Sequence, residues 1–391
     1  MKILIIADSI SSNTGGGKVG ILGVCRALMS YGNDVTLATS GVDEEYILSN
    51  NNSINVTIDG VNTFYFKPQV NLFGTRVSLS FIYYLFKNTI SYDLVLTHSL
   101  YKVHSSFAAF MARKQSIPYV IRPHGSLDSF LINRKRRLLK KLFIYLFEKK
   151  NFKYASAIQF SCLLEEEKAS KFISYWKKSI IVPEGIEQNK ASNVPNTNNN
   201  KLKFLKDKNI FKILFLGRFH EKKGIELLLN AFSQATQKNI ALHLVLAGTG
   251  DIEYVEKIKK LIEELNISHR CTITGYLSDT DKSRVMKLSN IFILTSYGEN
   301  FGLAVVEAMS FSLPVLVSNN VGISDSINSA KAGKVFNCDV DEIVEAIDFF
   351  ANNVEEQITY GNNAKYLADN VYTLSNMGLI MNKMYKDLVK I

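Results

Sequence analysis

The sequence predicts an α/β protein made of two doubly wound domains. Short apolar runs rich in β-branched residues alternate with longer stretches of helical periodicity. These runs lack the polar alternation of a half-exposed strand, which indicates strands buried on both faces of a parallel sheet. The alternation occurs twice, before and after a polar, Asn-rich segment at 189–203. Two successive βαβ series predict two parallel sheets, each covered by helices.

The strands follow one another in two series. The first series is predicted at 2–7, 34–39, 93–98, 118–123, 155–160 and 179–183, and the second at 212–217, 241–248, 271–276, 290–296 and 314–318. The predicted divisions are a first domain at 1–190, a linker at 191–204, a second domain at 205–373 and a terminal helix at 374–391 that packs back on the first domain. Ligands of open α/β sheets bind beyond the carboxyl ends of the strands, so we expect a site in a central cleft that the two sheets face.

The composition is typical of a globular enzyme. The 391 residues are 47% apolar and 21% charged. No apolar run approaches the ~18 residues that span a bilayer, and the opening MKILIIADSI is interpreted as a buried strand rather than a leader. The four cysteines, Cys25, Cys162, Cys271 and Cys338, have neither metal nor redox spacing, so we expect reduced thiols in a cytoplasmic protein.

The net charge of +10 is concentrated in one segment. Residues 134–153 hold nine Lys or Arg and one Glu, and therefore carry +8. Six apolar residues recur at helical spacing between these cations: Leu138, Leu139, Leu142, Phe143, Leu146 and Phe147. Two interpretations stay open, a surface helix packed on the first domain or a face that meets anionic lipid at the inner side of the plasma membrane. Nucleic acid is not expected, because the chain has no nucleic-acid-binding motif.

Two glutamates mark the candidate site in the second domain. Glu299 stands in the turn YGENFG after a predicted strand, and Glu307 lies inside the helix that begins near Gly302 and ends around Ser312. The first amides of this helix, at 301–303, can bind an anion, and a glycine lets the ligand approach the backbone. Flanking carboxylates accept hydrogen bonds from hydroxyls, which suggests a phosphate-bearing ligand with a sugar. The alternative is an acidic first turn that only complements the helix dipole.

A second loop adds positive charge to the site. In FLGRFHEKKGIELLL, Arg218 and Lys223 follow the carboxyl end of a predicted strand and precede a helix. Arginine forks onto phosphate oxygens and lysine adds a mobile charge, so the two cations match a diphosphate. A solvated basic loop is the alternative interpretation.

These motifs in this order resemble the family 4 retaining glycosyltransferases of the GT-B fold. GRFHEKKG precedes the E-x7-E pair by about 80 residues, the stretch 14–39 resembles the opening Gly loop of that family, and RPHGSLD followed by a basic stretch resembles its polysaccharide-building bacterial members. The resemblance covers essentially the whole chain. It implies transfer of a sugar from a nucleoside diphosphate sugar to a glycan or a polyprenyl-diphosphate-linked acceptor, in synthesis of O-antigen, capsule or exopolysaccharide.

The resemblance also implies residue roles. Arg218 and Lys223 hold the diphosphate, Glu299 contacts the hydroxyls of the transferred sugar, and His124 shares hydrogen bonds at the reacting centre. The remaining donor contacts that it implies are Gly16 and Gly17 near the phosphate, Tyr276 and Leu277 facing the base, Asn300, Phe301, Gly302 and Leu303 at the helix start, and Glu307 on the ribose.

The chemistry implied is front-face transfer with retention, in which the leaving phosphate takes the acceptor's proton. No metal or other cofactor is expected, and the Asp-x-Asp patterns at 278–281 and 339–341 are interpreted as caps and turns. His98, His104 and His220 are expected to be structural. The chain departs from the family at Glu184, where Asn is usual, and at Ser312, where Gly is usual.

Two other functions stay open. The first is an acceptor-independent nucleotide-sugar epimerase of the same fold, with His124 and Asp128 as the acid/base pair. The second is a non-catalytic sugar-nucleotide-binding subunit, which would not need to retain the four charged residues of the second domain.

Overall fold

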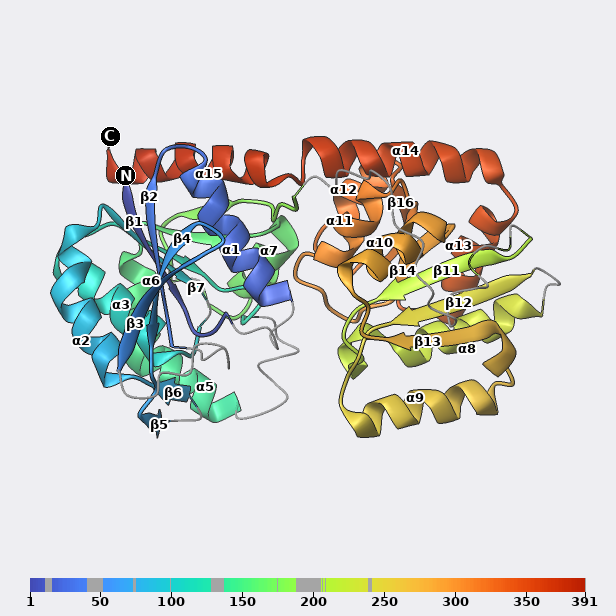
Figure 1. Ribbon diagram of the computed structural model, residues 1–391, viewed down its shortest axis with the longest axis horizontal. Helices are drawn as coiled ribbons and strands as arrows, with labels where there is room; N and C mark the ends of the chain where they lie inside the picture. Colours follow the sequence, from blue (N-terminus) through green and yellow to red (C-terminus); the bar gives the residue numbers. More distant parts are fainter. Residues whose placement is uncertain are drawn as a thin grey trace. The chain divides into compact units, whose positions relative to one another are not determined.

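The computed structural model describes residues 1–10, 16–40, 52–72, 75–98, 100–127, 137–173, 175–187, 205, 207, 209–237 and 241–390. At 16–18, 71–72, 75–76, 137 and 139 it describes the backbone only. The chain divides into two compact units, one formed by Met1–Glu187 with Thr373–Ile391 and the other by Gln188–Tyr372. Each unit is built around its own sheet (Figure 1).

The first unit holds an eight-stranded sheet in the order β10-β9-β8-β7-β1-β2-β4-β3. All pairs are parallel except β3 with β4. Its strands are β1 (Lys2–Ala7), β2 (Asp34–Thr39), β3 (Ser53–Ile58), β4 (Val61–Phe66), β7 (Leu94–His98), β8 (Tyr119–Arg122), β9 (Ala157–Phe160) and β10 (Ser179–Ile181), and a separate hairpin joins β5 (Val70–Leu72) to β6 (Thr75–Val77).

The helices of this unit cover the sheet (Figure 1). They are α1 (Gly16–Met29), α2 (Leu79–Asn88), the 3-10 turn η3 (Thr89–Ser91), α3 (Val103–Lys114), α5 (Arg137–Phe143), the π-helical turn η4 (Ile144–Glu148), α6 (Lys149–Tyr154), α7 (Leu163–Ser170) and α15 (Leu374–Val389). The terminal helix α15 packs beside α1, where Met377, Met381 and Tyr385 are buried in the same core as β1 and β2.

The second unit holds a six-stranded sheet in the order β13-β12-β11-β14-β15-β16, with every pair parallel. Its strands are β11 (Phe211–Leu216), β12 (Leu242–Ala247), β13 (Cys271–Gly275), β14 (Ile291–Leu294), β15 (Val315–Ser318) and β16 (Gly333–Phe336). Its helices are η6 (Glu221–Lys223), α8 (Ile225–Thr236), α9 (Ile252–Glu264), η7 (Ser268–Arg270), α10 (Asp279–Leu288), α11 (Leu303–Ser310), α12 (Ser324–Ser329), α13 (Val340–Ala351) and α14 (Val354–Asn370).

The predicted fold class is confirmed, and every predicted strand is present with its ends within two residues of the expected ones. The sheet order reverses direction at β1 and β7 in the first unit and at β11 and β14 in the second. Such switch points create a crevice at the carboxyl ends of the strands. The loops after β11 and β14 meet at this edge of the second sheet and carry the candidate residues.

The apolar stripe of the basic segment, for which two interpretations were open, is largely exposed. Most of the stripe does not pack against the first unit. The exposed fractions are 82% for Leu138, 52% for Leu142, 59% for Leu146 and 49% for Phe147. The face turned inward carries Ile144, Glu148, Asn151 and Phe152 instead. Residues 134–136, the linker and Asp128 lie outside the described residues. No helix in the described part of the chain is long and apolar enough to span a bilayer.

Candidate active site

Two loops at the carboxyl edge of the second sheet are fastened together. Thr295, just after β14, donates its hydroxyl to the carbonyl of Gly224 at 2.8 Å, and Ser296 donates to the carbonyl of Lys222 at 2.9 Å. The Tyr297 amide also donates to Lys222. These bonds give the Lys222 carbonyl two donors and add a second donor to the Gly224 carbonyl, which also accepts from the Leu228 amide. They fix the loop after β11 against the loop after β14.

The two loops bring Lys223 and Glu299 together. The Lys223 ammonium forms an ion pair with the Glu299 carboxylate, and each side chain keeps less than a quarter of its surface exposed. Gly224, the next residue, has φ +65° and lies so close to Thr295 that a Cβ would stand 2.2 Å from the Thr295 carbonyl oxygen. The tight turn that presents Lys223 therefore requires glycine at 224.

Glu299 is held through its backbone by the loop after β15. Its amide donates to the carbonyl of Asn320 at 3.0 Å, and its carbonyl accepts from the amide of Gly322 at 3.0 Å. The carboxylate therefore stands on a backbone that is anchored on both sides. This anchoring limits the entropy lost when a ligand binds to the carboxylate.

The helix after Glu299 opens with unbonded amides. Gly302 precedes α11 with φ +100° and ψ +56°, and no side chain caps the helix. Among the residues that the structure describes, the amides of Phe301, Gly302 and Leu303 form no backbone hydrogen bond. The Phe301 side chain is buried with its ring against Tyr372, at 5.5 Å between centroids. The helix start is thus a fixed group of donors with a partial positive charge, which is suited to an anion.

The other predicted donor residues of this unit occupy different settings. Glu307, inside α11, pairs with Lys282 of α10 at 3.3 Å. Arg218 is exposed on the loop after β11, and Tyr276 is 83% exposed after β13 while Leu277 beside it is buried. Asn300 lies in the turn between Glu299 and α11.

The two stretches that hold the Asp-x-Asp patterns form helix starts, in line with the predicted caps and turns. Ser278 accepts from the Asp281 amide at the start of α10, and Asp339 accepts from the amides of Asp341 and Glu342 at the start of α13. Within the described ranges, no three His, Cys, Asp or Glu residues form a group that could hold a metal ion.

His124 lies in the first unit, in the turn after β8. It adopts the left-handed conformation with φ +49°, and the following Gly125 has φ +70°. Its Nε2 lies 2.8 Å from Nδ1 of His98, which ends β7, and the two rings stack at 4.8 Å between centroids. Left-handed backbone at a residue other than glycine is uncommon and clusters at functional sites. Gly16 and Gly17 form the first turn of α1 in the same unit.

The surroundings of the two histidines keep both rings neutral. Burial, the other histidine and Arg122 lower the pKa of His98 well below its usual value. Burial and Arg122 lower the pKa of His124 to about 3, although about a third of its side chain remains exposed. A neutral ring donates through one nitrogen only. Nε2 of His98 is buried with no partner among the described residues. Because an orphaned N–H is rarer than an orphaned acceptor, we assign the shared proton to Nδ1 of His98.

Glu184 forms a buried ion pair beneath His124. Its Oε1 accepts from the Arg122 guanidinium at 2.6 Å and lies 3.9 Å from Nδ1 of His124. Arg122 keeps 2% of its side chain exposed and Glu184 10%, and burial raises the pKa of Glu184 against the lowering effect of Arg122. Glu165 accepts from the Gly125 amide of the same turn at 2.8 Å. Two carboxylates therefore lie close to the His124 turn, and one of them, Glu165, is hydrogen-bonded to its backbone.

The sequence interpretation missed His98, Arg122, Glu165 and Lys282 as partners of the candidate residues. His98 was expected to be structural, yet it bonds directly to His124. Its position at the end of a predicted strand beside the strand that leads to His124 was the available signal. His104 and His220 do have structural settings, since His104 accepts from the Ser78 amide and His220 caps η6.

Comparisons with known proteins agree with this architecture. The model described as "Glycosyltransferase Family 4" matches residues 14–161, and the model described as "Glycosyl transferases group 1" matches residues 196–366. The UDP-Gal:alpha-D-GlcNAc-diphosphoundecaprenol alpha-1,3-galactosyltransferase of Escherichia coli is 25% identical over 331 residues, 80% of this chain and 82% of that protein. An uncharacterized 41.2 kDa protein in the cps region of Klebsiella pneumoniae is 25% identical over 69% of this chain and 74% of its own length.

A solved structure shows the same fold. The Anabaena protein Alr3699/HepE, crystallised in complex with UDP and glucose, has a TM-score of 0.75 over 99% of this chain and 100% of its own, at 16% identity. This likeness extends over both units, and the two family models together span most of the chain. The chain therefore belongs to the GT-B glycosyltransferases that combine a Glycosyltransferase Family 4 segment with a Glycosyl transferases group 1 segment.

Proposed function

We propose that this glycosyltransferase moves a sugar from a nucleoside diphosphate sugar to a hydroxyl of a glycan or a lipid-linked acceptor, with retention of the anomeric configuration. The observation that carries the proposal is the junction of Lys223, Glu299 and the unbonded amides at the start of α11. A diphosphate needs positive charge and N–H donors, and the transferred sugar needs a carboxylate for its hydroxyls. The junction supplies all three.

The proposed reaction uses these groups in sequence. The bond between the anomeric carbon and the phosphate oxygen breaks, and its electron pair stays on that oxygen. Lys223, Arg218 and the amides stabilise the departing diphosphate. The acceptor oxygen bonds to the anomeric carbon on the same face, and its proton passes to the leaving phosphate oxygen. Loss of one preorganised donor at such a centre costs about 3–4 kcal/mol in the barrier.

The other roles follow from this assignment. Glu299 accepts from hydroxyls of the sugar, Glu307 accepts from the ribose hydroxyls in place of Lys282, and Tyr276 offers its exposed ring to the base. His124, neutral and bonded to His98, positions the sugar rather than acting as a base. No cofactor enters the proposed reaction, and the cations replace the charge of a metal. A nucleotide-sugar donor is supported by the Anabaena neighbour, which was crystallised with UDP and glucose.

We also propose a role in assembly of a bacterial surface polysaccharide, at the inner face of the plasma membrane. The Escherichia coli relative is named for an acceptor on diphosphoundecaprenol, and the Klebsiella pneumoniae relative lies in a cps region. The basic segment of the first unit provides cations near exposed apolar side chains, which suits an anionic surface.

One experiment tests the proposal. The purified chain is offered a panel of nucleotide sugars, with and without a membrane lipid extract and with and without EDTA. We expect nucleotide to be released only when the lipid extract is present, and EDTA to leave the rate of release unchanged. NMR determines the anomeric configuration of the product. A converted sugar formed without acceptor identifies an epimerase, and binding without turnover identifies a non-catalytic subunit. An inverted product contradicts the front-face reaction.

A further inference from the structure

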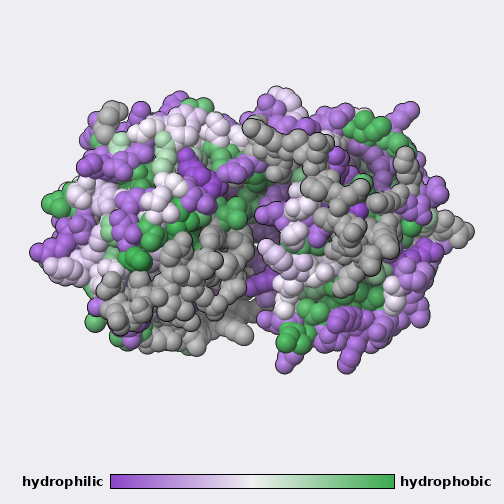
Figure 2. Space-filling view, viewed as in Figure 1, coloured by the Kyte–Doolittle hydropathy of each residue, from purple (hydrophilic) through white to green (hydrophobic). Residues whose placement is uncertain are grey.

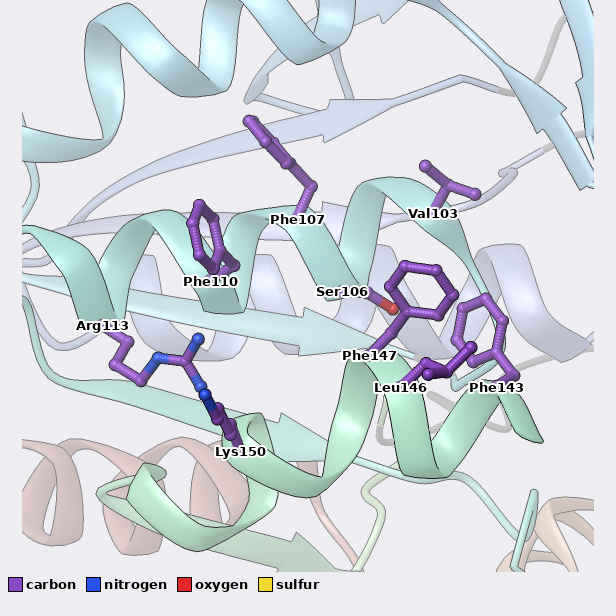
Figure 3. A pocket seen from close by; sticks show the side chains of 9 residues that line it. All are labelled: Val103, Ser106, Phe107, Phe110, Arg113, Phe143, Leu146, Phe147 and Lys150. Carbon is purple, nitrogen blue, oxygen red and sulfur yellow. The ribbon is translucent and has the colours of Figure 1, made fainter. Parts of the chain in front are cut away.

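An apolar groove opens on the first unit, between α3 and the segment formed by α5 and η4 (Figure 3). Its volume is about 430 Å³. The apolar side chains of its lining are Val103, Phe107 and Phe110 from α3, and Phe143, Leu146 and Phe147 from the facing segment. Aromatic and aliphatic carbon thus dominates both walls, which suits a hydrocarbon ligand.

A polar anchor joins the two walls of the groove. Ser106 of α3 donates to the buried Glu148 carboxylate at 2.5 Å, and Asn151 donates to the same group at 3.1 Å. Glu148 ends the π-helical turn η4, and such turns occur often at functional sites. With Glu148 and Ile144 turned inward, Phe147 and Leu146 are left 49% and 59% exposed.

Positive charge lies at one end of the groove. Figure 3 shows the Arg113 and Lys150 side chains close to one another there, away from the cluster of Phe143, Leu146 and Phe147. The Arg113 guanidinium lies 5.5 Å from the Phe110 ring centroid and 5.9 Å from that of Tyr154. Its Nη1 is buried and has no hydrogen-bond partner in the described part of the chain. A buried donor without a partner indicates a missing acceptor.

The surroundings of the groove match a membrane surface. The exposed side chains on the same segment include Leu138, Leu142 and Tyr145, at 82%, 52% and 65%. Exposed lysines stand among them at 141, 149 and 153. For comparison, most of the apolar side chains on the face that Figure 2 presents lie scattered among polar ones, which is the ordinary pattern of a protein surface. A group of large exposed apolar residues between lysines favours the boundary of an anionic bilayer.

We propose that this groove binds one hydrocarbon chain of an anionic membrane phospholipid, whose phosphate is held by Arg113 and Lys150. The proposal goes beyond glycosyl transfer and does not depend on it. The chain of the lipid fills the aromatic part of the groove, and the phosphate supplies the acceptor that Arg113 Nη1 lacks. Each methylene buried in the groove should strengthen binding about fourfold until the groove is filled.

Binding of monomeric alkyl phosphates to the full-length chain tests the groove without a bilayer. Calorimetry compares butyl, hexyl, octyl and decyl phosphate with inorganic phosphate and with decyltrimethylammonium. We expect affinity to rise with chain length and then level off, and the ammonium compound to bind at least tenfold more weakly than decyl phosphate. An affinity that does not depend on chain length, or that is equal for the two head groups, overturns the proposal.

Two variants with matched controls locate the site. Arg113→Gln and Phe147→Ser should each weaken decyl phosphate binding about tenfold, because one removes a charged donor and the other much of the apolar wall. Lys114→Gln, on the next residue, and Tyr83→Ser, on the exposed face of α2, should change it less than twofold. Thermal unfolding checks that all four variants fold. Equal losses in the variants and their controls contradict the assigned site.

Sedimentation with vesicles connects the groove to a bilayer. We expect the chain to sediment with vesicles of phosphatidylglycerol in phosphatidylcholine. Phe147→Ser should reduce the sedimented fraction, whereas Tyr83→Ser should leave it unchanged. Vesicle binding that is unchanged in Phe147→Ser reveals surface adsorption only and overturns the proposal. Binding of a polyprenyl phosphate with no response to phosphatidylglycerol assigns the groove to an acceptor lipid and overturns it as well.

Discussion

Lys223 is the residue on which the proposed chemistry depends most directly. Its side chain is more than three-quarters buried and its ammonium pairs with Glu299, a residue that shortly precedes the amides of Phe301, Gly302 and Leu303, which form no backbone hydrogen bond among the described residues. Replacement by alanine removes the cation and leaves the Glu299 carboxylate uncompensated where a diphosphate must bind. We therefore expect Lys223→Ala to lower kcat/KM sharply while the fold persists.

The size of the effect follows from two contributions. Loss of one preorganised donor to a developing oxyanion lowers the rate by about 10²–10³. The Glu299 carboxylate, left without its cation, adds repulsion of about 1 kcal/mol at this partly solvated position, a further factor of about five. The double variant Lys223→Ala/Glu299→Gln removes this repulsion but also the charged acceptor of the sugar hydroxyls, so its kcat/KM should not exceed that of Lys223→Ala.

Nucleotide release under initial-rate conditions measures both variants. Lys257→Ala is the matched control, because Lys257 also pairs with a glutamate of the second unit, Glu226, at 3.0 Å, but keeps 60% of its side chain exposed. The control should keep at least half of the wild-type kcat/KM. If Lys223→Ala retains more than about a tenth of that value with its thermal unfolding midpoint unchanged, the diphosphate assignment is wrong.

Three further predictions concern other parts of the chain. Glu184→Ala should lower the free energy of unfolding by about 3–5 kcal/mol, because it leaves the buried Arg122 unpaired; urea unfolding measures the loss, and a loss under 1 kcal/mol counts against the pair. Gly302→Ala should lower the stability by about 1–3 kcal/mol and weaken donor binding, since φ +100° strains any residue with a Cβ; unchanged stability and affinity speak against this strain. Burial lowers the pKa of His104 to about 4, so the unfolded chain binds more protons between pH 4 and 6.5 and stability should fall by up to about 3 kcal/mol as the pH drops through that window. His98 and His124 are also held neutral, so His104→Gln should reduce the steepness of this pH dependence in urea titrations without abolishing it; an unchanged steepness would show that other groups cause it.

The fold could be predicted from the sequence where strands are buried on both faces. Continuous apolar runs indicated β1, β2 and β11–β15, and the predicted ends are close to those observed. The hairpin of β3 and β4 was missed, although its alternating pattern, SINVTI and VNTFYF, surrounds an Asp59-Gly60 turn with φ +48° and +80°. Asp-Gly between two alternating runs is a strong hairpin signal that the search for apolar runs overlooked.

The basic segment shows why periodicity alone was insufficient. The apolar stripe predicted for it is largely exposed, whereas two of the residues that face inward are the polar Glu148 and Asn151. Glu148 accepts from the hydroxyl of Ser106, and Asn151 donates to the backbone carbonyl of Ser106, a residue more than forty positions away in the sequence. A sequence pattern ranks residues by hydropathy and cannot register a distant hydrogen-bond partner.

The sequence identified some residues of the candidate site but not the pairs that they form. Charged residues at strand ends identified Lys223 and Glu299, because parallel strands bring their carboxyl ends to one edge. The pairing of Glu307 with Lys282, and that of His124 with His98, depends on side-chain directions that spacing does not determine.

The terminal helix has a consequence for the order in which the chain folds. Because α15 completes the core of the first unit, its residues Met377, Met381 and Tyr385 leave the ribosome only after all of Gln188–Tyr372 has been made. The second unit is continuous in sequence and can finish folding during synthesis, whereas the first must wait with α1 uncovered. A released chain that ends before residue 374 should therefore resist protease in its later-made half and be cleaved in its earlier-made one.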